Sequence, residues 1–190
     1  AFKLGHCAYP QSTSTEGNLD ISSDHYALSS RVPAVLADTL KNRAYLSTQW
    51  LVNRMWEHGM NNLFQVGAID EAGTVFYYAE EYLDSQTWTL LALSATEAWT
   101  GIDPADHNGL PWISAFEHPV ALAPGDTVRG YGIKTFIPGT IWSEGTSGAA
   151  AAYAVLGDAP KALFYRSQVA KLQNADGGVL HLVGPAGAIW

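Results

Sequence analysis

Residues 141–158, with the sequence IWSEGTSGAAAAYAVLGD, indicate how this chain folds. Ser143 belongs to the residue types that favour the position just before a helix, and Glu144 would then lie in the first turn, where the helix dipole stabilises a carboxylate. The run 148–154 has almost no side-chain bulk, so we expect an inner helix that packs closely on its neighbours. The pair Gly157-Asp158 would end this helix and cap the next one.

The residues that follow complete a repeating unit. Apolar side chains recur on one face of residues 159–173 and basic side chains lie elsewhere, which is typical of an amphipathic outer helix. The sequence NADGG at 174–178 predicts a tight turn. One acid, one inner helix, one outer helix and one turn therefore make a unit.

The same order of acid, small polar residues and apolar helix occurs twice earlier in the chain. Residues 82–93, YLDSQTWTLLAL, contain Asp84, and residues 14–20, STEGNLD, contain Glu16. The three acids lie about 60 to 70 residues apart, a period above the usual range of solenoids that still suits helical hairpins with long loops. Simple capping of helix N-termini by acids explains the same pattern without a repeat, and both interpretations are kept open.

These segments, together with WSEGT at 142–146 and LQNADGG at 172–178, resemble bacterial exported proteins of the six-hairpin, (α/α)-toroid glycosidase type. The resemblance covers about residues 12–182, with Gly17 in place of the usual His and no clear counterpart for 98–138. It implies a mainly α fold: an (α/α) toroid or partial toroid of about three helical hairpins, with short β-hairpins in the loops on one face. Because a closed toroid of the family needs six hairpins, we expect residues 1–190 to be a single domain within a larger toroid, completed by its missing half or by a second chain.

The remaining elements are predicted from local patterns. We expect residues 63–67 and 74–78 to form a β-hairpin or an extended pair of loops, with a further strand at 128–137 and a loop-rich segment at 99–127. The helices expected besides those of residues 141–173 cover 20–31, 42–57, 84–95 and 112–118.

Composition excludes several classes of function. Of the 190 residues, 47% are hydrophobic and 15% charged, which indicates a globular protein with a substantial core. The net charge of −8 and the absence of a Lys/Arg cluster argue against nucleic acid as a partner, and no apolar run is long enough to span a membrane. We predict no metal site and no cofactor. Cys7 is the single cysteine, and the resemblance implies a secreted or periplasmic location in a bacterium.

In a toroid the N-termini of the inner helices converge on one mouth, so Glu16, Asp84 and Glu144 are expected to line a single acidic cleft. Carboxylates accept hydrogen bonds from sugar hydroxyls and carry out acid/base chemistry, which together with aromatic walls favours an oligosaccharide or polysaccharide as partner. We predict Glu144 as general acid and Asp84 as base, with Glu16 assisting, in a glycoside hydrolase that the resemblance implies to be inverting. The predicted sugar-binding residues are Trp142, Trp88, Tyr82, Tyr131, Asp20 and Gln86.

Two alternatives stay open. The first is a non-catalytic sugar-binding protein, for which Gly17 in place of the family's His is the main indication. The second is a structural assembly subunit, since low charge and many aromatic residues would supply adhesive interfaces. An enzyme requires two carboxylates that converge beside Trp or Tyr, a binder requires the aromatic residues without the pair, and an assembly subunit would bury them against another copy.

Overall fold

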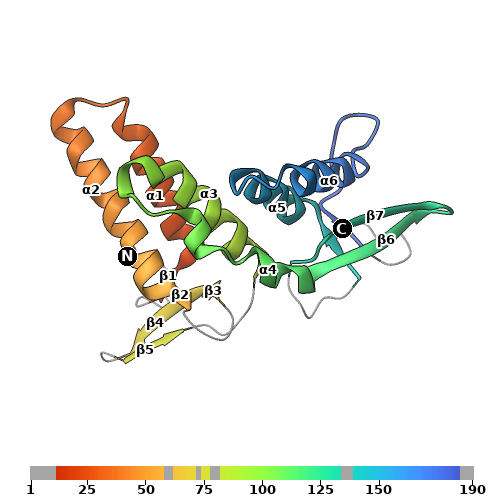
Figure 1. Cartoon of the computed structure of the whole chain (residues 1–190), viewed down its shortest axis with the longest axis horizontal. Coiled ribbons are helices and arrows are strands. Elements are labelled where there is room, and N and C mark those ends of the chain that lie inside the picture. The colour runs from red at the N-terminus through yellow and green to blue at the C-terminus, as the bar shows by residue number, and fades with distance from the viewer. Residues whose placement is uncertain (1–11, 58–61, 72–73, 78–81, 134–138, 185–190) are drawn as a thin grey trace. The chain divides into compact units, whose positions relative to one another are not determined.

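The computed structural model describes residues 12–57, 62–71, 74–77, 82–133 and 139–184, which divide into two compact units (Figure 1). Unit 1 comprises residues up to 80 and 88–108, and unit 2 comprises 81–87 and everything from 109 onward. The helix α3 (Leu83–Thr100) is divided by this boundary, because its first turn groups with unit 2 and the remainder with unit 1.

Unit 1 is built on a helical hairpin of α1 (Thr15–Ser29) and α2 (Ala34–Trp50), which lie side by side in Figure 1. Buried hydroxyl groups hold the two helices together: Ser22 Oγ lies 2.7 Å from Thr48 Oγ1, and Ser47 Oγ donates to the carbonyl of Asn18 at 3.0 Å. Helix α1 begins earlier than the predicted residue 20, so Glu16 and Asp20 are both helical. The two helices pack partly through buried polar side chains, which a pattern of hydrophobic residues does not register, so the start of α1 was predicted too late in the sequence.

Helix α2 also begins before its predicted start at residue 42, directly after Pro33, whose fixed φ suits a helix entry. It continues as the π-helical turn η1 (Leu51–Met55) and then enters the short strand β2 (Trp56–Glu57), which pairs with β3 (Leu63–Phe64). The core of unit 1 gathers here from α1, the π-helical turn η1, these strands, residue 68 and α3. It consists of Leu19, Leu51, Val52, Met55, Trp56, Phe64, Ala68, Ala92 and Leu93.

A small antiparallel sheet completes unit 1, in the strand order β1 (Ser12–Ser14), β4 (Gly67–Glu71) and β5 (Thr74–Tyr77). The second strand of the predicted hairpin is confirmed as β5, but the first is placed wrongly: β5 pairs with β4, which shares only residue 67 with the prediction, and residues 63–64 pair with β2. Residues 72–73 and 78, which the prediction includes, lie outside the described residues. After α3 the chain forms the 3₁₀ turn η2 (Pro104–His107), capped by the carboxylate of Asp103.

Unit 2 contains the hairpin of α5 (Ser143–Val155) and α6 (Ala159–Ala170). Most of α5 is buried, as expected for an inner helix, and Gly157 with φ of 79° ends it as predicted. The carboxylate of Asp158 accepts from the N–H of Lys161 at 3.2 Å and so caps α6. The prediction that Ser143 caps α5 is wrong, because Ser143 is itself helical and its hydroxyl donates to the carbonyl of His181.

The loop-rich segment predicted at 99–127 contains a strand that the sequence pattern missed. Strand β6 (Glu117–Ala123) pairs with β7 (Asp126–Tyr131), and the predicted strand at 128–137 is confirmed over the residues shared with β7, while 134–137 lie outside the described residues. Pro119 and Pro124 are residues typical of loops, but Pro119 is exposed on a two-stranded sheet, where both strands are edges and proline is tolerated. The short helix predicted at 112–118 is α4 (Leu110–Ile113) followed by η3 (Ser114–Phe116).

The chain after α6 returns to brace the start of α5. The predicted turn at 174–178 is closed by the N–H of Asn174, which donates to the carbonyl of Gly178 at 2.6 Å. Strand β9 (Leu182–Val183) then pairs with β8 (Ile141–Trp142), which leads directly into α5. A second core, formed by Val120, Val128, Ile141, Leu172 and Val183, lies beneath these strands.

The fold is therefore mainly helical, with short β-hairpins before α3 and before α5, as predicted. Two of the expected helical hairpins are α1–α2 and α5–α6, whereas α3 is followed by short turns and α4 in place of a long second helix. The expectation of a single domain stays a prediction beside the two compact units. Within the described residues no helix is both long and apolar enough to cross a membrane.

Candidate functional site

Two of the three predicted catalytic acids come together in unit 2. Asp84 lies in the first turn of α3 and is half-buried, and Glu144 lies in the first turn of α5 and is exposed. Their charges interact, since the carboxylate of Glu144 contributes to raising the pKa of Asp84. The structure brings these two acids near one another, and their shared cleft and catalytic roles stay predictions.

Close packing of the two helix starts positions the pair. A Cβ atom on Gly145, the residue after Glu144, would lie 2.6 Å from Leu83 Cδ2 and 2.8 Å from Trp142 Cζ3. Leu83 immediately precedes Asp84, and both Leu83 and Trp142 are buried. Only glycine permits this approach, so the backbone of α5 lies against the start of α3 and the two acids are held near one another.

Burial of Asp84 is the largest cause of its raised pKa, and repulsion by Glu144 adds to it. Opposing these effects, the carboxylate accepts hydrogen bonds from backbone N–H groups, including that of Ser85 at 2.7 Å. The Asp84 carboxylate therefore satisfies backbone N–H groups at the start of α3, in agreement with the interpretation that the acids cap helix N-termini. Because the raising effects prevail, its protonated form is favoured more than in an ordinary aspartate.

Trp142 is fixed beside this pair by the strand that carries it. It pairs with Leu182 across β8–β9, and the next residue, Ser143, donates its N–H to the carbonyl of His181 at 3.0 Å. The ring of His181 meets the indole edge to face, with 6.4 Å between the ring centres. Trp142 is 7% exposed, and its indole Nε1 has no hydrogen-bond partner among the described residues. A buried donor of this kind is a candidate for contact with a ligand.

The other predicted sugar-binding residues of unit 2 are less accessible. Tyr82 is half-buried just before α3. Gln86 is fully buried, and its side-chain Cδ lies 3.3 Å from the position that a Cβ on Gly109 would take. Tyr131 is 1% exposed. Gln86 and Tyr131 therefore contribute to the packing that supports the pair of acids.

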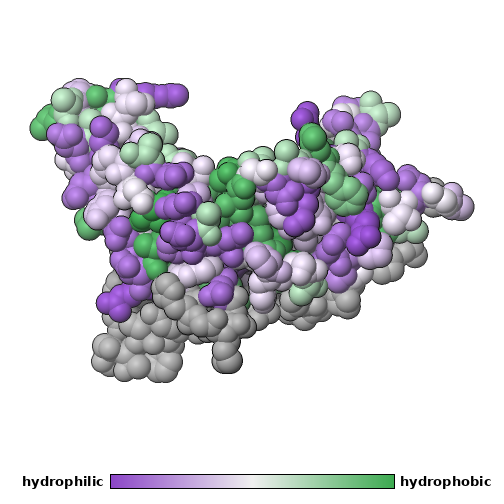
Figure 2. All heavy atoms as spheres, viewed as in Figure 1, coloured by the Kyte–Doolittle hydropathy of each residue, from purple (hydrophilic) through white to green (hydrophobic). Residues whose placement is uncertain are grey.

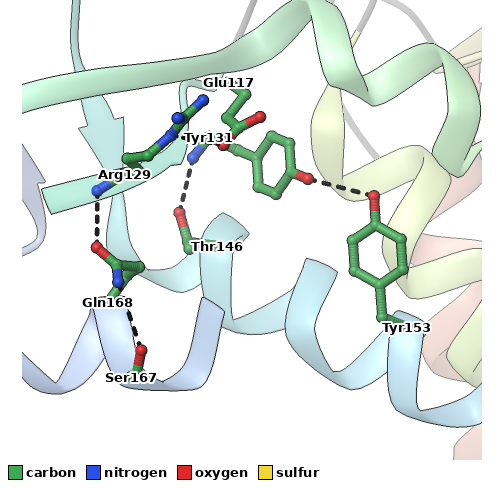
Figure 3. Close-up of polar contacts among 7 residues, drawn as sticks. All are labelled: Glu117, Arg129, Tyr131, Thr146, Tyr153, Ser167 and Gln168. Carbon is green, nitrogen blue, oxygen red and sulfur yellow. Dashed lines mark hydrogen bonds and ion pairs between the residues drawn. The ribbon is translucent and has the colours of Figure 1, made fainter. Parts of the chain in front are cut away.

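Tyr131 belongs to a buried polar cluster that ties β7 to α5 and α6 (Figure 3). Its hydroxyl lies 3.2 Å from that of Tyr153, and its N–H donates to Thr146 Oγ1, which in turn donates to the carbonyl of Trp142. Burial, followed by hydrogen bonding to Tyr153, raises the pKa of Tyr131. Burial also raises the pKa of the neighbouring Tyr165, to about 12.

In unit 1 the structure places Asp20 and Trp88 around one hollow. This hollow has a volume of about 440 Å³ and is lined by Leu19, Asp20, Ser23, Trp88, Leu91, Ala92 and Ala95. Asp20 is exposed at its edge, and Trp88 is half-buried. Glu16 is exposed in the first turn of α1 in the same unit. The convergence of Glu16 with Asp84 and Glu144 in a single cleft stays a prediction.

Sequence reasoning missed several residues of these sites. Ser23 lies three residues after Asp20, and Leu91 and Ala95 follow Trp88 at helical spacing, so the i, i+3, i+4 pattern could have identified them. Gly145 and His181 carried no such signal, because their importance comes from contacts between segments distant in the sequence.

A second hollow in unit 2 has a different character. It lies between α5 and α6, has a volume of about 390 Å³, and is lined by Ser147, Ala150, Ala151, Ala154, Ala162, Leu163, Arg166 and Val169. None of the described residues that line it carries a carboxylate, so these residues offer little acid/base chemistry. Among the described residues no group of three or more His, Cys, Asp or Glu side chains is arranged to hold a metal ion.

Comparison with known proteins defines the class of fold. No protein-family model matches the chain, and no curated protein matches its sequence. A solved structure of a glycoside hydrolase family 76 mannosidase from Bacteroides thetaiotaomicron is similar, with a TM-score of 0.58 and 11% identity over 89% of this chain and 47% of that one. A solved D-mannose isomerase is similar with a TM-score of 0.57 and 10% identity over 95% of this chain and 47% of that one.

Both solved structures have (α/α)-toroid-type folds, so this chain has the fold of a partial (α/α) toroid. The chain spans about half the length of each of them. At these identities the likeness shows the fold alone.

Proposed function

We propose that this protein acts on carbohydrates, as a glycoside hydrolase that cleaves an oligosaccharide or polysaccharide with Asp84 and Glu144 as its acid/base pair. The observation that carries the proposal is the pairing of these two carboxylates at the starts of α3 and α5, close enough for the charge of Glu144 to raise the pKa of Asp84. Pairs of carboxyl groups with different environments are the usual means of dividing acid and base roles in glycosidases. The toroid fold, shared with a mannosidase and a sugar isomerase, supports the same class of substrate.

The environments of the two carboxyl groups suggest which one donates the proton. A half-buried carboxyl with a raised pKa retains its proton nearer to neutral pH, so we assign Asp84 as general acid. The exposed Glu144 would then activate water as the base. This assignment reverses the roles expected from the sequence. Inversion, which the family resemblance implies, is kept as part of the proposal and is tested by the anomer of the first product, observed by NMR.

Trp142 and Tyr82 supply the aromatic side of the proposed site. Aromatic rings pack on the apolar faces of sugar rings, a role open to the half-buried Tyr82, whereas the buried Trp142 can contribute only its indole N–H, which has no hydrogen-bond partner among the described residues. We further propose that the complete active protein includes the other half of the toroid, from the same or a second chain, because the chain spans about half of the similar solved structures. A secreted or periplasmic location is proposed on the resemblance to exported proteins.

The test is the release of reducing ends from a panel of α- and β-linked oligosaccharides, mannosides included, by the wild type and by Glu144→Gln and Asp84→Asn. We expect each variant to lose at least about 100-fold in kcat, the usual contribution of a positioned acid or base, with little change in KM. Asp176→Asn, which removes a carboxylate from an exposed turn distant in sequence from the pair, is the matched control and should retain full turnover. Full activity in both site variants would exclude the pair from the mechanism.

A second candidate function, a structural assembly subunit, is favoured by one observation. Leu163 on α6 is 63% exposed and Val35 at the start of α2 is 83% exposed, and Figure 2 shows hydrophobic side chains reaching the surface near both helices. The next residues along, Leu36 and Phe164, are exposed as well, and adjoining apolar side chains at a surface are typical of contact sites between proteins. Light scattering over a range of protein concentrations tests it: an assembly subunit would form oligomers that Leu163→Gln weakens, whereas a constant monomer mass would count against this function.

A further inference from the structure

The hollow between α1 and α3 in unit 1 has the dimensions and lining of a small-molecule site. Its volume of about 440 Å³ falls within the range of about 300–1,000 Å³ that is usual for ligand pockets. The described residues of its lining are mainly apolar, and their polar groups come from Asp20 and Ser23 on α1 and from the indole N–H of Trp88. A ligand that fits must therefore present an apolar face to most of the hollow and its polar groups to one side.

Trp88 forms the aromatic wall of this hollow. Part of its side chain packs against the core cluster of unit 1, and the remainder borders the open volume. An aromatic wall anchored on a packed core is held in one orientation, which reduces the entropy lost when a ring stacks on it. Leu91 and Ala95, on successive turns of the same helix, extend the apolar surface.

Among the described residues, no basic side chain forms an ion pair with the carboxylate at the edge of the hollow. The ion pairs among the described residues involve Glu117, Asp158 and Asp126, and none involves Asp20. Burial by neighbouring atoms raises the pKa of Asp20, and the negative charge of Asp24, one helical turn further along α1, raises it further. A cation placed beside Asp20 would relieve both effects, because it offsets the lost hydration and the repulsion together.

An ammonium group fits this combination better than a neutral hydroxyl. A cation in this hollow would be attracted by the negative charge of the Asp20 carboxylate and by the electron-rich face of the Trp88 indole ring. We propose that this hollow is a binding subsite for a hexosamine unit with a free, protonated amino group, which donates to Asp20 while the apolar face of the sugar ring packs on Trp88. This inference names the substrate class of the proposed carbohydrate function and rests on it.

The experiment compares D-glucosamine with D-glucose as probes, by titration calorimetry on the whole chain at about pH 6, where the amine is protonated. We expect glucosamine to bind at least tenfold more tightly than glucose, with an advantage that diminishes as salt is added. Asp20→Asn should reduce glucosamine binding to the level of glucose. Asp38→Asn, which removes an exposed carboxylate from α2 outside the hollow lining, is the charge-matched control and should leave the preference intact.

Two further variants test the hollow itself. Trp88→Phe should weaken both sugars, and Ala95→Leu, at an exposed position of the lining, should obstruct the hollow and abolish binding of both without disturbing the core. Equal affinity for the two sugars, an equal loss in Asp38→Asn, or binding unaffected by Ala95→Leu would each overturn the proposal.

The outcomes also separate this inference from the proposed function. Turnover that depends on Glu144 without any preference for glucosamine would overturn only the amino-sugar subsite. A preference that Asp20→Asn abolishes, in a protein whose Glu144→Gln and Asp84→Asn variants show unaltered turnover, would overturn only the hydrolase.

Discussion

Gly145 offers the most direct test of how the pair of acids is positioned. In an ordinary helix, replacing glycine by alanine stabilises by about 1 kcal/mol, because the backbone loses less entropy on folding. At Gly145, however, the added methyl group would lie 2.6 Å from Leu83 Cδ2 and 2.8 Å from Trp142 Cζ3, and both of these side chains are buried. Neither neighbour can move freely into solvent, so the packing cost opposes the helix gain.

The change in the free energy of unfolding caused by Gly145→Ala is the difference between the packing cost and the helix gain. Overpacking a well-filled core costs about 1–3 kcal/mol, and here one methyl group meets two fixed side chains, which places the cost at the upper end of the range. After the helix gain is subtracted, Gly145→Ala should lower the free energy of unfolding by about 1–2 kcal/mol. For a chain of this size that corresponds to a fall in Tm of roughly 2–8 °C.

Urea and thermal unfolding followed by circular dichroism measure the effect, with Ala151→Gly as the control. Ala151 is exposed on the same helix, so this change reports the helix propensity alone and should cost about 1 kcal/mol. Because Gly145 adjoins Glu144, the displacement should also lower turnover in the proposed hydrolase. A Gly145→Ala protein as stable as the wild type, or more stable, would refute the close packing of the starts of α3 and α5.

Two aspartates at helix starts should respond in opposite ways. Because the pKa of Asp84 is raised in the folded state, the folded protein binds more protons than the unfolded chain at pH values between the ordinary and the raised pKa. The free energy of unfolding therefore falls as the pH rises through that window. Asp84→Asn should remove this pH dependence and be at least as stable as the wild type in urea at pH 7. Asp158→Ala should instead cost about 1 kcal/mol in the same assay, because it removes the cap of α6, and an unchanged midpoint would contradict the capping role.

Prediction from the sequence succeeded where local rules act. The cap at Asp158, the left-handed glycine at position 157 and the turn at 174–178 depend on residues within a few positions of one another. It failed at the start of α1 and at β6. The first is stabilised by hydroxyl contacts with α2 that hydrophobic periodicity does not register, and the second by pairing with β7 despite two prolines.

The residues of the candidate site also fall into two groups, those that local sequence patterns predict and those that only the structure can assign. Asp84 and Glu144 could be selected from sequence because each is an acid in the first turn of a recurring helical unit, and helix geometry alone places Trp88 one turn beyond Asp84. Tyr131 and Gln86 could not be judged by the same means, since their residue types suit either sugar binding or core packing, and only the structure shows that they are buried.

The sequence by itself determined the acid-bearing helices, the cap at Asp158 and the turn at 174–178, because these follow from interactions between near neighbours in the chain. Only the tertiary structure decided which acids meet and which aromatic residues stay accessible. The contact of Gly145 with Leu83 and the pairing of Trp142 with Leu182 join segments separated by tens of residues, and such contacts arise from packing and burial that no local pattern encodes.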